Sequence, residues 1–362
     1  MRAIRSFLLL MLMIIGAIYF LPFQELSFPN WLHIDKSESK ENKQEVEQAI
    51  SQPTNSSLTD ETVSSEPIEG ELLGWIGKDS QELSEAYGEP IRKDKSSYGY
   101  NWWIYSDKKS QYAQFGIRDK KVVTVFITGS KGKMDGISLG ESYKDLKGKR
   151  SFQKEVSFNV GVTSYRFTLT DKDLKMRPLV KLSNERFMQL YFDTFTGKLS
   201  SIRAMDADTL LVQRPYDIFY TGNLPEAPIL SDKEWAEVED GAEQQIFDIT
   251  NIIRTRHQVG VLKWDEVVAT VALGHSKDMS IHKYFSHYSQ DGKGLKDRLS
   301  EKDVIYKMAG ENIAAQYTDG PAAVEGWLNS EGHRHALLEG NYTHLGVGVY
   351  KYYYTQNFLQ KS

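Results

Sequence analysis

The chain has 362 residues, a hydrophobic share of 40% and no cysteine. This length allows two ordinary domains with packed cores, and the lack of cysteine excludes disulfides, thiolate metal sites and a cysteine nucleophile. A formal net charge of -5, without a basic patch interleaved with aromatic residues, gives no reason to expect a nucleic-acid partner.

The N-terminal segment has the pattern of an export signal. Arg2 and Arg5 precede an apolar run that extends to position 23. The run is roughly 15 residues long before Pro22, against about 20 for a spanning helix, but no small-residue cleavage site follows it. We therefore predict a single-pass signal anchor over residues 1–23 in the cell membrane, with secretion after signal cleavage as the alternative. The two arginines should stay in the cytoplasm, which places the bulk of the chain on the extracytoplasmic side.

Residues 24–70 are expected to form a disordered polar linker. They are rich in Glu, Ser, Lys, Gln and Thr, with few large apolar residues after Trp31. Burial cannot offset the entropy lost on ordering such a segment. We expect it to hold the following domains away from the membrane.

Residues 71–212 are predicted to form a β-rich α+β domain. A short helix ends near Tyr87, where a Gly follows. Strand-like runs come next over 98–105, 112–117 and 122–127, and the spacing of the last two predicts a hairpin.

A second, looser copy of this pattern follows the first. Gly140 and Leu146 keep the spacing of Gly77 and Leu83, and a second hairpin is predicted around the turn at 196–198. The domain is therefore expected to consist of two related halves, each with one helix.

Trp102 and Trp103 are adjacent in the first predicted strand. They could form a ligand platform or belong to the aromatic core of a twisted sheet, and we favour the core. This half of the chain shows no catalytic constellation, since no histidine occurs between His33 and His257.

Residues 213–240 contain three prolines and an acidic stretch over 232–240, which predicts an interdomain linker. The C-terminal domain, over 241–362, shows helical periodicity in its first half and alternating strands at its end. The predicted elements are helices over 243–257, 265–279, 295–300 and 322–329, a helix capped by Ser330, and strands over 345–350 and 352–358.

The polar chemistry of the chain is concentrated in this last domain. Seven of the eight histidines lie there: His257, His275, His282, His287, His333, His335 and His344. His275 and His282 are seven residues apart on one helical face, as two metal ligands could be, but a packed helix histidine is the commoner case and the one we favour.

Seven short motifs occur in a fixed order in this domain. They are Asn251-x-x-Arg254, Leu262-x-Trp264, Phe285-Ser286-His287, Gly310-Glu311-Asn312-Ile313-Ala314, Trp327-x-Asn329-Ser330-x-Gly332-His333-Arg334, Gly346-Val347-Gly348 and Thr355-Gln356-Asn357-Phe358. In this combination the domain resembles the CAP superfamily (cysteine-rich secretory proteins, antigen 5 and pathogenesis-related 1 proteins), in its bacterial, cysteine-free branch. The preceding domain resembles the CAP-associated N-terminal domain of membrane-anchored Gram-positive members.

The resemblance implies an α-β-α sandwich, also called SCP-like, with a central cleft. Two histidines and two glutamates converge there in the family, and some members bind a divalent metal such as zinc through the histidines. His287, Glu311 and His333 match three of these residues. The family position of the second glutamate is occupied here by Ser330, and Glu331 is the next residue. One helical step turns a side chain by about 100°. Whether Glu331 replaces the second glutamate therefore stays open.

Two neutral imidazoles and a carboxylate could hold Zn²⁺ or another divalent cation and leave a position for water. A carboxylate beside that water, such as Glu311, could act as a general base. No His-Glu-x-x-His motif is present, which excludes the common zinc-protease arrangement. Alternatively, Glu311 and His333 only hydrogen-bond buried backbone and each other.

We therefore expect a membrane-tethered, extracytoplasmic binding or structural module of the bacterial cell envelope. Its partners are the membrane, through the N-terminal segment, and a lipid, peptide or cell-wall ligand in the cleft. The alternative is a metal-assisted hydrolase, a peptidase or cell-wall enzyme, that uses Glu311. A third possibility is a scaffold for protein contacts whose cleft is vestigial.

Overall fold

The computed structural model of the chain describes residues 24–26, 68 and 70–361. The predicted signal anchor and most of the predicted polar linker lie outside these residues. Within them, no helix is both long and apolar enough to cross a membrane.

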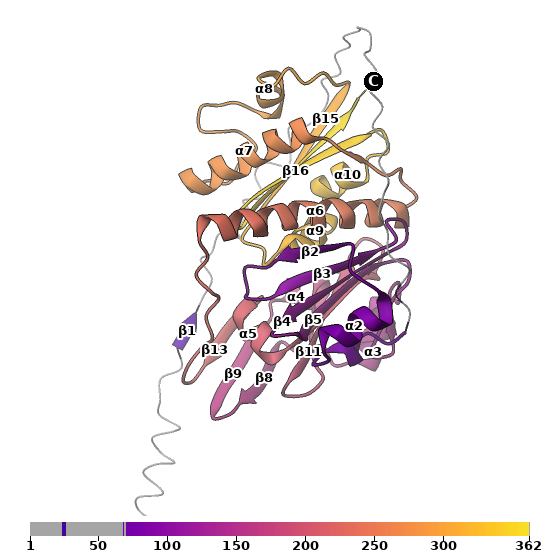
Figure 1. Cartoon of the computed structure of the whole chain (residues 1–362), viewed down its shortest axis with the longest axis vertical. Helices are drawn as coiled ribbons and strands as arrows, with labels where there is room; N and C mark the ends of the chain where they lie inside the picture. The colour runs from indigo at the N-terminus through magenta and orange to yellow at the C-terminus, as the bar shows by residue number, and fades with distance from the viewer. Residues whose placement is uncertain (1–23, 27–67, 69, 362) are drawn as a thin grey trace, which may run out of the picture.

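The first domain is built on a seven-stranded antiparallel sheet with the order β10-β11-β12-β5-β4-β3-β2 (Figure 1). Its strands are β2 (Arg92–Lys95), β3 (Asn101–Ser106), β4 (Gln111–Arg118), β5 (Lys121–Gly129), β10 (Leu179–Lys181), β11 (Arg186–Asp193) and β12 (Lys198–Asp206). Both predicted hairpins, β4–β5 and β11–β12, are present, and they meet where β5 pairs with β12. The central strands β4, β5, β11 and β12 are buried along nearly their whole length, as expected for a sheet covered on both faces.

The two related halves are confirmed by matching hydrogen bonds. In the first half, Gly77 N donates to Val122 O beside the start of helix α2 (Ser80–Tyr87). In the second, Gly140 N donates to Leu199 O beside the start of α3 (Tyr143–Lys149). Both helices therefore begin against the first residues of a hairpin's second strand, as a duplicated unit would.

A smaller sheet, with the order β1-β13-β9-β8, completes this domain. The remaining elements are β1 (Gln24–Leu26), β6 (Lys133–Met134), β7 (Ile137–Ser138), β8 (Glu155–Val160), β9 (Thr163–Thr168), β13 (Asp217–Tyr220), the short helix η2 (Leu73–Trp75), α4 (Asp171–Met176) and α5 (Ala207–Gln213).

The segment predicted as an interdomain linker is largely structured. It contains β13 and the start of helix α6 (Asp232–Arg256), which begins 11 residues before the predicted residue Glu243. The acidic stretch is the first part of this helix, because Ser231 and Glu234 form a capping box. Acidic residues also stabilise a helix at its N-terminal end.

The C-terminal domain is the expected α-β-α sandwich. A four-stranded sheet with the order β14-β16-β17-β15 lies between helix α7 on one side and α6, α9 and α10 on the other (Figure 1). Its elements are β14 (Lys263–Trp264), α7 (Glu266–His282), α8 (Leu295–Ser300), β15 (Met308–Ala315), α9 (Gly320–Leu328), α10 (Glu331–Leu338), β16 (His344–Tyr350) and β17 (Tyr353–Gln360).

Two glycines allow helix α7 to lie directly on the sheet. A Cβ added at Gly346 would come 2.2 Å from the backbone nitrogen of Ala269, and one at Gly348 would come 1.8 Å from that of Leu273. These distances leave no room for a side chain, which explains the Gly346-Val347-Gly348 motif on β16.

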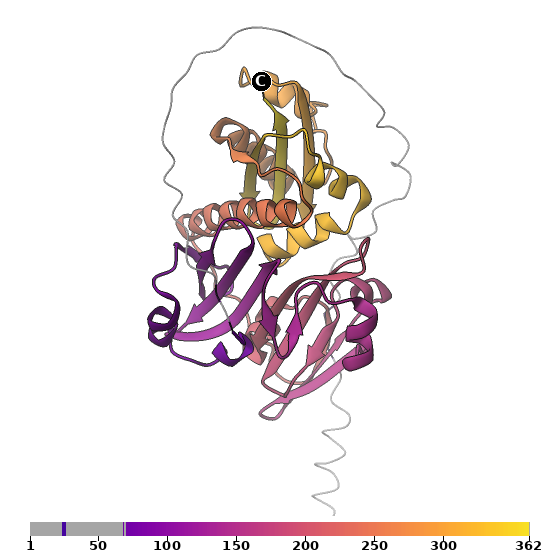
Figure 2. The ribbon, with the colours of Figure 1, turned by 90° about the vertical axis from the view of Figure 1, so that its right-hand side faces the viewer.

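Helix α6 joins the two domains. It runs along the junction between them (Figures 1 and 2), and one continuous cluster of buried residues includes Trp102 and Phe126 of the first domain with Ile246 and Ile249 of α6. Trp102 is 2% exposed in this cluster, while Trp103 packs against the other face of the sheet. The predicted assignment of both tryptophans to the core is confirmed.

Candidate functional site

His287 and Glu311 come together from two elements of the C-terminal domain. His287 lies in the loop after α7, and Glu311 lies on β15. The Nδ1 atom of His287 is 2.9 Å from Oε1 of Glu311. The histidine side chain is 50% exposed and the glutamate side chain 4% exposed, so the pair has a buried end and an open end.

Arg298 of α8 holds the other carboxylate oxygen. Its Nη2 atom donates to Oε2 of Glu311 at 2.7 Å, and Nη1 donates to the backbone oxygen of His287 at 3.1 Å. The guanidinium therefore fixes both the glutamate and the loop that carries the histidine. No sequence pattern pointed to this residue, because its contacts with His287 and Glu311 form only through tertiary packing.

Glu311 stays ionised in this setting. Burial by itself raises the pKa of the carboxyl, but the hydrogen bond from His287 and the charge of Arg298 outweigh it and hold the pKa below its usual value. A carboxylate with a lowered pKa and both oxygens engaged is a weak general base.

His333, on α10, has its Nδ1 atom 2.8 Å from the hydroxyl oxygen of Ser330. Ser330 is the N-cap residue of α10, as predicted, but its side chain makes no capping hydrogen bond and contacts His333 instead. The backbone oxygen of His333 accepts a hydrogen bond from Asn312 at 3.1 Å. Burial, helped by the charge of His287, lowers the pKa of His333 to about 4, so the ring is neutral at pH 7.

The two imidazole rings lie near each other. Their ring centres are 6.5 Å apart with an interplanar angle of 38°. Each Nδ1 atom is held by a side chain, and among the described residues neither Nε2 atom has a hydrogen-bond partner. We call His287, Arg298, Glu311 and His333 the histidine site.

Glu331 does not complete a group of ligands with these residues. It is exposed at the first position of α10. Among residues 70–361, no three His, Cys, Asp or Glu side chains lie close enough to hold a metal ion together. Two imidazoles on one tetrahedral zinc ion have ring centres roughly 5 Å apart, so the 6.5 Å separation fits two-histidine binding only after a small rotation.

His275 and His282 have separate roles on α7. His275 is 1% exposed and its Nε2 atom lies 2.9 Å from the backbone oxygen of Ser286, next to His287. Because a carbonyl only accepts, this nitrogen carries the proton, and burial lowers the pKa of the ring. His282 contacts Asp278 of the same helix. The prediction that His275 is a packed histidine is confirmed.

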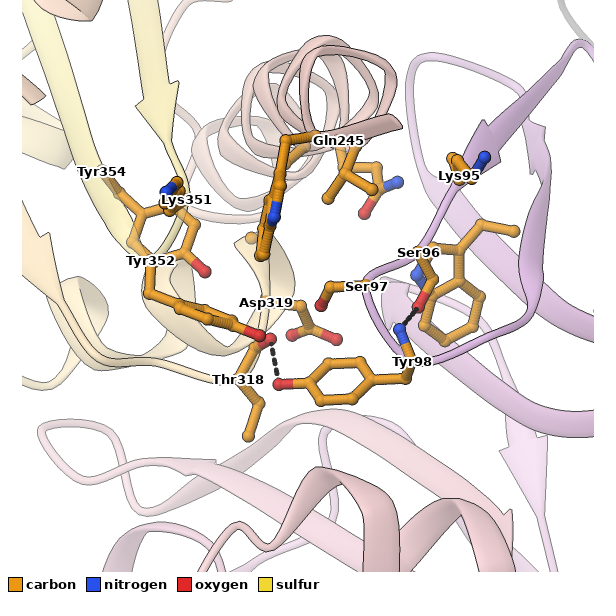
Figure 3. Close-up of a pocket in the computed structure, with 15 residues that line it drawn as sticks. Lys95, Ser96, Ser97, Tyr98, Gln245, Thr318, Asp319, Lys351, Tyr352 and Tyr354 are labelled. Atoms are coloured by element: carbon orange, nitrogen blue, oxygen red, sulfur yellow. Dashed lines mark hydrogen bonds between the residues drawn. The ribbon is translucent and has the colours of Figure 1, made fainter. Parts of the chain in front are cut away.

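A small pocket lies between the two domains, and none of the histidines lines it (Figure 3). Its volume is about 30 Å³, and the Tyr98 hydroxyl donates to the backbone oxygen of Thr318 at 2.8 Å beside it. This is room for about one water molecule. The pocket is a gap in the domain interface and does not include the histidine site.

Comparisons with known proteins agree with this architecture. The profile of the CAP-associated N-terminal domain matches residues 76–216, and that of the cysteine-rich secretory protein family matches residues 247–361. The membrane protein YlbC of Bacillus subtilis (strain 168) is 48% identical over 290 residues, which cover 80% of this chain and 84% of YlbC.

Two solved structures cover most of the chain. An extracellular SCP-domain protein from Bacillus anthracis has a TM-score of 0.77 at 45% identity, over 84% of this chain and 100% of its own. A cysteine-rich secretory protein from Staphylococcus aureus, SAV1118, has a TM-score of 0.70 at 25% identity, over 81% of this chain and 94% of its own. The chain therefore belongs to the cysteine-rich secretory protein (CAP) family, in the bacterial form that carries a CAP-associated N-terminal domain.

Proposed function

We propose that this protein is an extracytoplasmic, membrane-tethered binding module. Its ligand-contacting residues would be His287 and His333. The basic and apolar N-terminal sequence supports the tether, as do relatives named a membrane protein and an extracellular protein.

The main support for this proposal is that the Nε2 atoms of His287 and His333 have no hydrogen-bond partner among the described residues. Glu311 and Ser330 hold the opposite edges, which is the arrangement that orients histidines toward a metal ion. A divalent cation such as Zn²⁺ fits this donor set. His287 and His333 would hold it, and it would polarise an oxygen of the bound ligand.

A cation held by two imidazoles keeps positions for other donors. Structural zinc sites use four protein ligands and catalytic sites three, so two histidines alone predict modest metal affinity. The remaining positions suit water and oxygen donors of a second ligand, and we propose a peptide or other cell-wall component in that role.

The hydrolase alternative has less support. Glu311 is the carboxylate that would activate water, but Arg298 and His287 engage both of its oxygens. Its lowered pKa also weakens it as a base. These contacts suit a residue that orients His287 better than one that accepts a proton.

Zinc titration calorimetry of the full-length protein in detergent tests the proposal. We expect binding near one equivalent, abolished by His287→Ala or His333→Ala. His335→Ala is the matched control, because His335 lies on the same helix and is exposed. Absence of zinc binding in the wild type, or loss in the control variant, would refute the metal-dependent form of the proposal.

A further inference from the structure

Two residues of the longest motif, Asn329 and Arg334, make no contact with the histidine site. Asn329 lies in the two-residue segment between α9 and α10, and Arg334 lies in α10. Both side chains bond to the first domain. Their partners are Phe192, Asp193 and Thr194, at the end of β11 and the start of the β11–β12 turn.

Both the oxygen and the nitrogen of the Asn329 side-chain amide form hydrogen bonds. Its Oδ1 atom accepts hydrogen bonds from the backbone nitrogen and the hydroxyl of Thr194, at 2.8 and 2.7 Å. Its Nδ2 atom donates to the backbone oxygen of Phe192 at 2.8 Å and to that of Glu325 at 3.0 Å. The end of β11 with the residue that follows it and the end of α9 thus meet at one side chain.

Arg334 forms a two-point ion pair with Asp193. The distances are 2.9 Å from Nη1 to Oδ1 and 3.0 Å from Nη2 to Oδ2, and the Asp193 side chain is 3% exposed. Asp193 also accepts hydrogen bonds from the backbone nitrogens of Phe195 and Thr196. The turn therefore holds the carboxylate in the orientation that a guanidinium fork requires.

These contacts bracket the residue that orients His333. Ser330, whose hydroxyl contacts Nδ1 of His333, follows Asn329, and Arg334 follows His333. Helix α10 is only eight residues long, and Leu337 is the one buried residue that this fully described helix contributes. A helix this short is not stable by itself, so its position depends on what holds its ends.

We propose that the β11–β12 turn of the N-terminal domain, through Asp193 and Thr194, is a positioning element of the histidine site. It fixes the segment between α9 and α10 and thereby the ring of His333. The histidine site is then a property of both domains, although all of its own residues belong to the C-terminal one.

A linkage between the domain interface and the site follows. If the interface favours the binding-competent position of His333, a ligand on His333 favours the intact interface by the same free energy. This second statement rests on the proposed function, whereas the positioning of His333 does not.

The test uses full-length Asp193→Ala, with Thr194→Val as a milder second variant. Both changes lie in the first domain, so any effect on His333 must cross the interface. Hydrogen–deuterium exchange at the imidazole C2 position, resolved by mass spectrometry, reports the exposure of each histidine. We expect faster exchange at His333, because the loss of the turn contacts leaves its ring less firmly packed. Zinc affinity should fall about tenfold, as for other residues that orient metal-bound histidines.

Arg92→Ala is the matched control. It breaks another interdomain ion pair, Arg92 with Asp248 of α6 at 3.0 Å, which does not touch α9 or α10. His333 should keep its wild-type exchange in this variant. An equal change in Arg92→Ala and Asp193→Ala, or unchanged His333 exchange in both folded turn variants, would overturn the proposal. Wild-type protein that binds no zinc would refute the proposed function and leave the exchange test intact.

Discussion

The domain interface and the histidine site use charged residues in opposite ways. At the interface, Arg203 is fully buried and pairs with Asp319 at 2.8 Å, and Glu325, 2% exposed, accepts hydrogen bonds from the hydroxyls of Ser200 and Ser201. At the histidine site, the charged side chains of Arg298 and Glu311 are buried, whereas the side chain of His287 is half exposed. These interface groups therefore bond to one another, whereas at the histidine site the Nε2 atoms of His287 and His333 have no hydrogen-bond partner among the described residues.

The largest effect on stability is expected for Arg203→Ala, which removes a buried charge of the domain interface. Removing one partner of a buried ion pair leaves the other charge uncompensated, so we expect a loss of about 3–5 kcal/mol in the free energy of unfolding. Urea denaturation followed by near-ultraviolet circular dichroism measures it. Because both domains share one core, a single transition should shift; two separate transitions in the wild type would contradict that expectation.

The pH dependence of stability tests how far the histidine site is buried. The pKa of His333 is about 4 in the folded state against 6.5 as the ordinary value, so the unfolded chain binds more protons between these values. Stability from this residue is present above pH 6.5 and is lost as the pH falls toward 4, by about 3 kcal/mol. In His333→Asn, the urea midpoint should depend less on pH over this range. In His335→Asn, the midpoint should keep the pH dependence of the wild type.

Arg298→Met tests whether the buried charges of the histidine site contribute to metal binding. Without the guanidinium, Glu311 loses its cation and orients His287 less firmly. We expect zinc affinity to fall about tenfold, as for other residues that orient metal-binding histidines, although both histidines are still present. Calorimetry measures the change, and an affinity equal to that of the wild type would show that Arg298 only stabilises the fold.

The smallest effect is expected at the rim of the interface. Lys95 pairs with Glu234 at 3.0 Å, but both side chains are partly exposed, and such solvent-screened pairs contribute little to stability. Lys95→Ala should therefore shift the urea midpoint little and leave the exchange of His333 unchanged. A loss as large as that of Arg203→Ala would mean that the rim and the buried part of the interface are not distinct.

Local patterns in the sequence predicted much of the fold. The β4–β5 hairpin and helix α8 follow from spacing and turn residues that lie within a few positions of each other. The start of α6 was missed, because an acidic run near prolines resembles a linker until its capping box is recognised at Ser231 and Glu234. Strand β13 was missed because its partner, β9, is about 50 residues away.

The site was predictable only in part, for a similar reason. The motifs pointed to His287, Glu311 and His333, and the structure brings His287 within 2.9 Å of Glu311. Neither Arg298 nor the contact of Asp193 with Arg334 could be predicted, since these partners meet only through tertiary packing. Glu331 was one helical step from the matching position, and it lies exposed.

The shared core also fixes an order of events during synthesis. The first domain is made before α6, and until residues 232–256 follow, the sheet face that carries Trp102 and Phe126 lacks the cover of this helix. A chain interrupted between the domains would expose this aromatic surface, and such surfaces promote aggregation. The second domain therefore covers part of the core of the first.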